Sequence, residues 1–212
     1  MSFKSSIAIT AGKTSHWFLH NFMHGGTSLP GKLTLKIDPD VLKALAKNYE
    51  IVIITGTNGK TLTTALTVKV LQAKYGNVLT NKSGSNMKQG IVTAFLTAQK
   101  TSSGKNLAVL ETDEANVPIV CEYIKPKMFV LTNLFRDQMD RYGEIYTTYG
   151  KILKGVLMHP DALVLANGDA PIFNSKELPN KVVYYGFADK AEKDQLAPAN
   201  TDGLLCPGCQ HI

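Results

Sequence analysis

The feature that most constrains the fold of this chain is an alternation of short apolar runs with longer helical segments, which begins near Glu50. Runs rich in β-branched residues predict strands, and strands that alternate with helices are typical of a parallel sheet. The candidate strands are 51–55, 78–80, 107–111, 128–131, 162–166 and 182–185, and the candidate helices between them are 60–74, 87–99, 115–124 and 144–158. We therefore expect an α/β fold in which a parallel sheet is flanked by helices.

The residues before this sheet are predicted to be helical. Within 5–23, apolar residues recur on one helix face, at Ile7, Ala11, Phe18 and Phe22. Gly25-Gly26 and Pro30-Gly31 break this pattern, and Asp38-Pro39 opens a further helix because Asp favours the N-cap and Pro the first helical position. We expect residues 1–48 to form a helical segment that packs on the core.

The composition indicates a folded, water-soluble chain. Hydrophobic residues make up 44% of the 212 residues and charged residues 19%, so an intrinsically disordered chain is excluded. The net charge of +6 favours an anionic partner, but the lysines are scattered and form no stripe typical of a nucleic-acid module. No stretch approaches the ~20 apolar residues that cross a bilayer. With only three cysteines and no signal peptide, we expect a cytoplasmic protein.

A glycine-rich loop follows the first strand, with the sequence Gly56-Thr57-Asn58-Gly59-Lys60-Thr61. A strand, such a loop and a helix in succession predict a phosphate-binding loop for MgATP. Glycines let backbone N–H groups face phosphate oxygens, Lys60 reaches the β- and γ-phosphates, and Thr61 ligates Mg²⁺. The strict G-x-x-x-x-G-K-[ST] pattern is not met, because Ile54 stands where its first glycine belongs. The alternative is a tight turn with a surface lysine.

A phosphate loop requires a carboxylate for Mg²⁺, and the end of a neighbouring parallel strand is where it is expected. Glu111 ends the strand 107–111, so it is our candidate metal ligand. Asp113 and Glu114 follow as supporting candidates. Asp113 is also well placed to cap the helix that begins near Ala115, and both interpretations can hold together.

A third polar cluster, 132–144, follows the next strand. It lies where ligands bind in open parallel sheets, and its arginines, Arg136 and Arg141, are suited to bidentate contacts with phosphate or carboxylate. A solvated loop held by salt bridges explains the same residues equally well.

These motifs together resemble the central domain of the Mur ligases. The resemblance is carried by the phosphate loop, the Glu111 turn, the run Asp137-Gln138-Met139-Asp140-Arg141-Tyr142 and Asn167-Gly168-Asp169. The MurT branch of this family is more similar still, through 11–13, 26–32, Ser85-Asn86-Met87 and Cys206-Pro207-Gly208-Cys209. The resemblance implies a Mur ligase central ATP-binding domain at 49–188, the start of a zinc-ribbon insertion at 189–212, and a C-terminal Mur ligase domain that is absent from this chain.

The resemblance also implies a reaction. Mur ligases activate a carboxylate as an acyl phosphate with ATP, and an amine then attacks. The MurT branch uses ammonia from its GatD-type glutamine amidotransferase partner to amidate the D-glutamate α-carboxylate of the lipid II stem peptide, which gives isoglutamine. It acts in the cytoplasm at the inner face of the membrane. The implied catalytic residues are Lys60 and Glu111, Mg²⁺ is held by Thr61 and Glu111, and Asn86 and Asn167 join the loop in binding ATP.

Two positions depart from the Mur ligase pattern. Gln138 stands where many members have a metal-binding histidine, which puts a second metal site in doubt. The position of their carbamylated lysine falls at Leu153, with Lys151 and Lys154 only nearby. We therefore predict no lysine carbamate in this chain.

The cysteines and histidines were considered as metal ligands. Cys206 and Cys209 form half of a four-ligand structural Zn²⁺ site, His211 is a weaker candidate for a third ligand, and the resemblance places the remaining two cysteines beyond residue 212. Cys121 is expected to be a small buried hydrophobe. One helix face carries His16, His20 and His24, and we interpret it as a solvated or partner-facing stripe.

Other functions remain as alternatives. One is a Mur or folylpolyglutamate-type ligase that adds an amino acid, and another is a non-catalytic module that binds nucleotide or zinc. A GTPase would need a guanine-reading N-K-x-D, but Asn81-Lys82-Ser83-Gly84 has glycine in place of the aspartate.

Overall fold

The structure is a computed structural model, and it describes residues 2–22, 28–81, 84–98, 106–135 and 144–187. Its strands are β1 (Tyr49–Thr55), β2 (Val78–Thr80), β3 (Asn106–Glu111), β4 (Pro126–Leu131), β5 (Leu163–Asn167) and β6 (Val182–Tyr185). The helices are α1 (Phe3–Phe22), α2 (Leu29–Ile37), α3 (Val41–Ala46), α4 (Lys60–Tyr75), α5 (Lys88–Leu96), α6 (Val117–Cys121), α7 (Glu144–Leu157) and the short 3-10 helix η1 (Pro171–Asn174).

All six strands form one parallel sheet in the order β2-β3-β1-β4-β5-β6. The chain leaves β1 for the β2 edge, returns to β3 beside β1, and then crosses to β4 on the other side of β1. The direction of winding therefore changes at β1, and the carboxyl end of β1 is the place where ligands bind in sheets of this kind.

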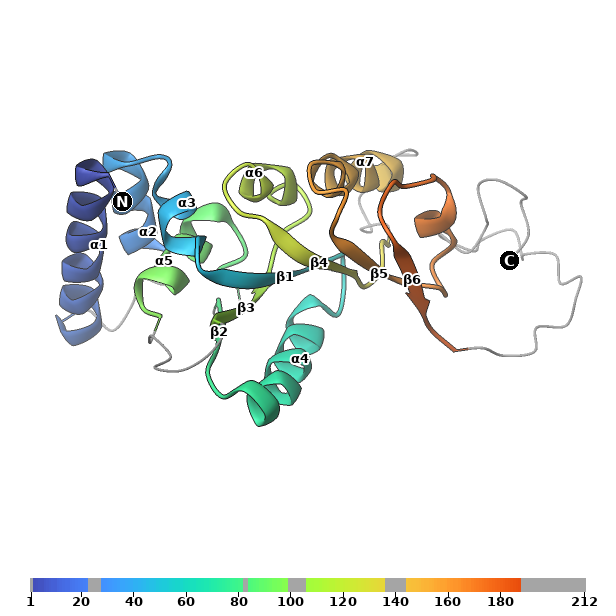
Figure 1. The fold of residues 1–212 in the computed structure, drawn as a ribbon, viewed down its shortest axis with the longest axis horizontal. Helices are drawn as coiled ribbons and strands as arrows, with labels where there is room; N and C mark the ends of the chain where they lie inside the picture. Colours follow the sequence, from blue (N-terminus) through green and yellow to red (C-terminus); the bar gives the residue numbers. More distant parts are fainter. Residues whose placement is uncertain (1, 23–27, 82–83, 99–105, 136–143, 188–212) are drawn as a thin grey trace, which may run out of the picture.

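The sheet carries a hydrophobic core on each face. Figure 1 shows α4 on one side of the sheet, with α6 and α7 on the other. In β1, Ile51 and Ile53 join the larger core, whereas Ile54 joins the smaller core together with Val68 of α4. Because β1 is buried on both faces, its sequence is a continuous apolar run. This burial fixes the strand that leads into the glycine-rich loop.

The predicted strands are confirmed, with boundaries that differ by two residues or fewer. Helix α2 was not predicted, because Pro30-Gly31 was interpreted as a break. Both residues lie in the first turn of α2, where a proline needs no N–H donor. A Cβ atom on Gly31 would lie 1.9 Å from the backbone oxygen of Gln89. Gly31 therefore permits the close packing of α2 on α5.

Two predicted helix boundaries are corrected. Helix α3 begins at Val41 rather than near Asp38, whose buried carboxylate accepts a hydrogen bond from Ser5 Oγ at 2.6 Å and ties α1 to the start of α3. Helix α6 spans only Val117–Cys121 within the predicted 115–124. Among the described residues, no helix is long and apolar enough to cross a membrane.

Candidate functional site

The glycine-rich loop lies between β1 and α4, at the point where the sheet changes direction. Gly56 has a φ of +135° and Gly59 a φ of +80°, conformations that side chains rarely adopt. Gly56 also lies against the segment after β4, since a Cβ atom there would be 2.2 Å from Thr132 Oγ1 and 2.7 Å from the Asn133 oxygen. The two glycines are thus required by backbone conformation, and Gly56 by close approach as well.

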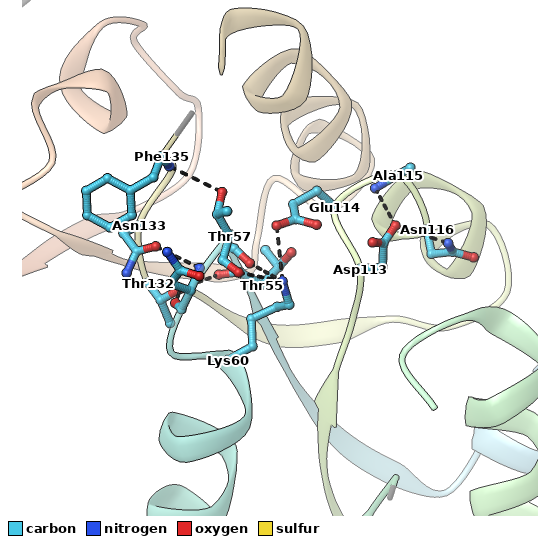
Figure 2. A network of polar contacts seen from close by, with 12 residues as sticks. Thr55, Thr57, Lys60, Asp113, Glu114, Ala115, Asn116, Thr132, Asn133 and Phe135 are labelled. Atoms are coloured by element: carbon cyan, nitrogen blue, oxygen red, sulfur yellow. Dashed lines mark hydrogen bonds and ion pairs between the residues drawn. The ribbon is translucent and has the colours of Figure 1, made fainter. Parts of the chain in front are cut away.

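The segment after β4 braces this loop (Figure 2). The backbone N–H of Thr57 donates to the Asn133 carbonyl at 2.7 Å, and that of Asn58 donates to Asn133 Oδ1 at 2.9 Å. Thr132 Oγ1 donates to the Asn58 carbonyl at 2.9 Å, and Phe135 N donates to Thr57 Oγ1 at 3.3 Å. The start of the predicted cluster 132–144 therefore holds the loop in shape, while 136–143, with both arginines and Gln138, lies outside the described residues.

Lys60 is the first residue of α4, and its side chain folds back over the loop. Its ammonium group donates to the carbonyl oxygens of Gly56 and Thr57, the latter at 3.1 Å. It also forms an ion pair with Glu114 Oε1 at 3.2 Å, in which each side chain is only 14% exposed. Figure 2 shows this pair joining the loop after β1 to the turn after β3. The predicted cation is therefore held between the loop and a carboxylate.

The start of α4 supplies backbone donors beside Lys60. The first hydrogen bond of the helix runs from Thr63 N to the Gly59 carbonyl at 2.9 Å. The N–H groups of Lys60, Thr61 and Leu62 therefore precede the hydrogen-bond ladder of the helix, as at any helix N-terminus. Such groups favour an anion. Thr61 lies in this first turn with an exposed side chain, where its hydroxyl can meet a ligand from solvent.

Glu111 ends β3 directly beside β1, where it pairs in register with Ile54, and it is 5% exposed. The side-chain amide of Asn81 fixes its backbone, because Asn81 Nδ2 donates to the Glu111 carbonyl and the Glu111 N–H donates to Asn81 Oδ1. Asn81 thus bridges the ends of β2 and β3.

The residues around Glu111 fit a hydrated Mg²⁺ ion. The hydroxyl oxygens of Thr55 and Thr112 are buried and have no hydrogen-bond partner among the described residues. Thr55 ends β1, the neighbour of β3, and Thr112 directly follows Glu111. A carboxylate and hydroxyl oxygens are the oxygen ligands that Mg²⁺ and its waters prefer. The described residues contain no group of three or more His, Cys, Asp or Glu side chains that could hold a metal ion.

The turn after Glu111 brings Asn86 to the same edge. The N–H of Asp113 donates to the Asn86 carbonyl at 3.0 Å. Asp113 Oδ1 accepts from the N–H of Ala115 at 3.0 Å and from the side-chain amide of Asn116 at 3.3 Å. Asp113 therefore shapes the turn that leads into α6, and Asn86 lies next to this acidic turn. The predicted capping role of Asp113 is wrong, because α6 begins at Val117 and its N-cap is Asn116.

Asn167 lies farther from the loop than the other candidates. It ends β5, which is separated from β1 by β4. Its side-chain oxygen accepts from the Asp169 N–H at 2.9 Å and closes the turn after the strand. Asn167 shares the carboxyl edge of the sheet with Lys60 and Glu111, but its side-chain hydrogen bond is made within its own turn and not to the loop.

The remaining candidates lie in the core, on α1 or outside the described residues. Cys121 is 3% exposed, and burial raises the pKa of its thiol to about 12, so it is an inert core residue as predicted. Leu153 is buried in the larger core. The rings of His16 and His20 stack at 6.0 Å. His24, Cys206, Cys209 and His211 lie outside the described residues.

Sequence reasoning missed the roles of Thr132 and Asn133 as braces and of Glu114 as the partner of Lys60. The bracing role of Thr132 and Asn133 could have been predicted, because both residues directly follow the strand beside β1. The ion pair between Lys60 and Glu114 could not, since 54 residues separate its members along the chain.

The fold and the loop define a class of protein. Residues 54–203 match the Mur ligase middle domain. The chain therefore belongs to the Mur ligase family.

Within that family the predicted resemblance to MurT is confirmed. The chain is 55% identical over all its residues to "Lipid II isoglutaminyl synthase (glutamine-hydrolyzing) subunit MurT" of Streptococcus pneumoniae, and it covers 47% of that protein. It is 39% identical over 188 residues to the subunit of the same name from Staphylococcus aureus, which covers 88% of this chain and 42% of that protein. The chain thus spans about half the length of these relatives.

Solved structures agree on the fold. MurF ligase of Thermotoga maritima, solved in complex with ADP, matches 72% of this chain and 36% of its own with a TM-score of 0.61 and 20% identity. Folylpolyglutamate synthase of Mycobacterium tuberculosis, also complexed with ADP, matches 84% of this chain and 50% of its own with a TM-score of 0.55 and 14% identity.

Proposed function

We propose that this chain is the ATP-binding part of an amide ligase that converts the D-glutamate α-carboxylate of lipid II to the amide of isoglutamine. The observation that carries the proposal is 55% identity to a MurT subunit over the whole chain, in which Lys60 and Glu111 occupy a loop and strand end suited to MgATP. The MurF and folylpolyglutamate synthase structures of the same fold were solved with ADP, which supports nucleotide binding at this sheet edge.

The proposed reaction has two steps. A carboxylate oxygen of D-glutamate attacks the γ-phosphorus of ATP. The bond between this phosphorus and the β,γ-bridging oxygen breaks, so that ADP departs and an acyl phosphate is formed. Ammonia released from glutamine then attacks the carbonyl carbon, the C–O bond to phosphate breaks, and nitrogen loses a proton to give the amide and inorganic phosphate. The protein forms no covalent bond to the reactants in this scheme. It contributes by positioning them and by stabilising the charge that develops.

The residues of this chain have separate tasks in that scheme. Lys60 neutralises charge on the transferred phosphoryl group, and the N–H groups at the start of α4 bind phosphate oxygens. Thr61 and Glu111 would hold Mg²⁺, which would neutralise phosphate charge. Asn86 lies beside the acidic turn and is proposed to contact phosphate or substrate, and Asn167 is proposed to contact ATP from the end of β5.

The proposal extends to partners and location. The name of the relatives describes a subunit of a glutamine-hydrolysing synthase, which supports a GatD-type glutaminase as the source of ammonia. Because lipid II is membrane-linked, the chain would act at the inner face of the membrane. A structural Zn²⁺ held partly by Cys206 and Cys209 stays a prediction, as does the zinc-ribbon segment at 189–212.

The nitrogen donor tests this proposal against a ligase that adds an amino acid. The full-length protein, with the C-terminal domain that the resemblance implies, is combined with the glutaminase subunit, MgATP and lipid II, and ADP release is measured with glutamine, with ammonium chloride, or with a panel of amino acids. We expect ADP release and a product lighter by about one mass unit with glutamine or ammonium only. Release driven by an amino acid, with a product heavier by one residue, would contradict the proposal and favour the alternative ligase.

A further inference from the structure

Helices α1 and α2 expose several large apolar side chains. The exposed side chains are Phe3, Ile7, Trp17, Phe18, Phe22, Leu29 and Leu33. Between the two helices lies an open groove of about 800 Å³, lined in part by Ile7, Phe18, Leu29 and Leu33. Large exposed apolar patches on a protein surface mark interaction sites.

This surface does not face the core of the domain. In α1 the buried residues are Ser5, Ala8, Gly12 and Leu19. At 100° per residue, Phe3, Ile7 and Phe18 lie on a different side of the helix from this buried face. In Figure 1, α1 forms the outer end of the molecule, beyond α2 and α5. The apolar stripe is therefore presented outward along the length of α1.

The charged side chains of residues 1–37, the segment that contains α1 and α2, are all positive. Residues 1–37 contain four lysines, at positions 4, 13, 32 and 36, and no Asp or Glu. All four lysines are exposed. In α2, Lys32 and Lys36 follow Leu29 and Leu33 by three residues each, so lysines and leucines share one helix face. Apolar side chains and cations are thus interleaved on one surface.

We propose that this α1–α2 surface docks on an anionic lipid bilayer. Exposed Trp and Phe side chains are suited to the boundary between headgroups and acyl chains, and lysines on the same face are attracted to anionic headgroups. A protein-binding surface would not require the absence of every acidic residue from 37 consecutive positions. The inference does not depend on the proposed ligase activity.

Vesicle sedimentation tests the inference without any reaction. The whole chain is mixed with vesicles of phosphatidylcholine alone or with 30% phosphatidylglycerol, and the bound fraction is measured. We expect binding to the anionic vesicles that weakens in high salt. The double variant Lys32→Gln/Lys36→Gln is expected to lose about twenty-five-fold in partition coefficient, since each lysine contributes roughly a factor of five. The variant Phe18→Ser/Leu33→Ser is expected to lose at least tenfold.

Matched control variants lie on α4, on the other side of the sheet. Lys69 and Lys74 are exposed lysines, and Leu66 and Val70 are exposed apolar residues. Lys69→Gln/Lys74→Gln and Leu66→Ser/Val70→Ser should bind vesicles as the unchanged chain does. No binding to anionic vesicles, or equal losses in the α4 variants, would overturn the proposal. A dimer would also overturn it. In that case sedimentation velocity would show concentration-dependent dimers, and Phe18→Ser/Leu33→Ser would abolish them without any change in vesicle binding, because a second copy of the chain would cover the surface.

Discussion

At the residue scale, the ammonium group of Lys60 has an acceptor for each of its three protons: the carbonyls of Gly56 and Thr57 and the carboxylate of Glu114. A phosphate oxygen must therefore displace one of these acceptors. Of the three acceptors, Glu114 carries a negative charge. It therefore competes with phosphate for the ammonium group of Lys60 and also repels the phosphate.

The variant Glu114→Gln should therefore bind ATP more tightly, by about 1 kcal/mol or fivefold, because a mostly buried competing charge is removed while Lys60 keeps its place. Titration calorimetry with MgATP measures this, and Glu122→Gln, at an exposed position after α6, is the control. Weaker binding by Glu114→Gln would mean that Glu114 positions Lys60 rather than competing for it.

At the scale of elements, the strands were predictable and part of the helical layer was not. Continuous apolar runs such as Ile51–Ile54 identify buried parallel strands locally. By contrast, α2 depends on a contact that no local pattern contains: Gly31 packs against α5, whose residues lie about sixty positions later. The candidate site divides in the same way. Lys60 and Glu111 are identified by the loop motif and the strand end around them, whereas their contacts with Glu114 and Asn81 join residues 54 and 30 positions apart in the chain.

The packing of α2 on α5 gives a stability prediction. Gly31→Ala places a Cβ atom against the backbone oxygen of Gln89 and should destabilise the chain by roughly 1–3 kcal/mol. In α7, Gly150 has no atom within 4 Å of a Cβ position, so Gly150→Ala should instead stabilise by about 0.5–1 kcal/mol. Urea unfolding of both variants measures the difference. Equal effects of the two substitutions would contradict the packing described here.

At the scale of the whole molecule, the larger core contains two groups that titrate only at high pH. Burial raises the pKa of Cys121 to about 12 and that of Tyr149 to about 12. The folded state thus favours the neutral form of each. The stability that follows is fully present below the ordinary values of 9.0 and 10.0 and is lost as pH rises toward about 12.

Tyr149→Phe should accordingly reduce the loss of stability between pH 9 and pH 11. At pH 8 the same variant should be less stable by about 1 kcal/mol, because it lacks the hydrogen bond from Tyr149 Oη to the Phe173 carbonyl. Urea unfolding at the three pH values tests both effects, with exposed Tyr146→Phe on the same helix as the control. If Tyr149→Phe lost as much stability in alkali as the unchanged chain, the raised pKa of Tyr149 would not be a cause of that loss.

The central claim for the molecule is that the loop between β1 and α4 binds MgATP through Lys60. The most direct measurement is the dissociation constant of MgATP for the unchanged chain, for Lys60→Ala and for Lys69→Ala, which removes an exposed lysine from the same helix. We expect the affinity for MgATP to fall about tenfold or more in Lys60→Ala and to stay unchanged in Lys69→Ala. Equal affinity in all three proteins would contradict the binding of MgATP through Lys60.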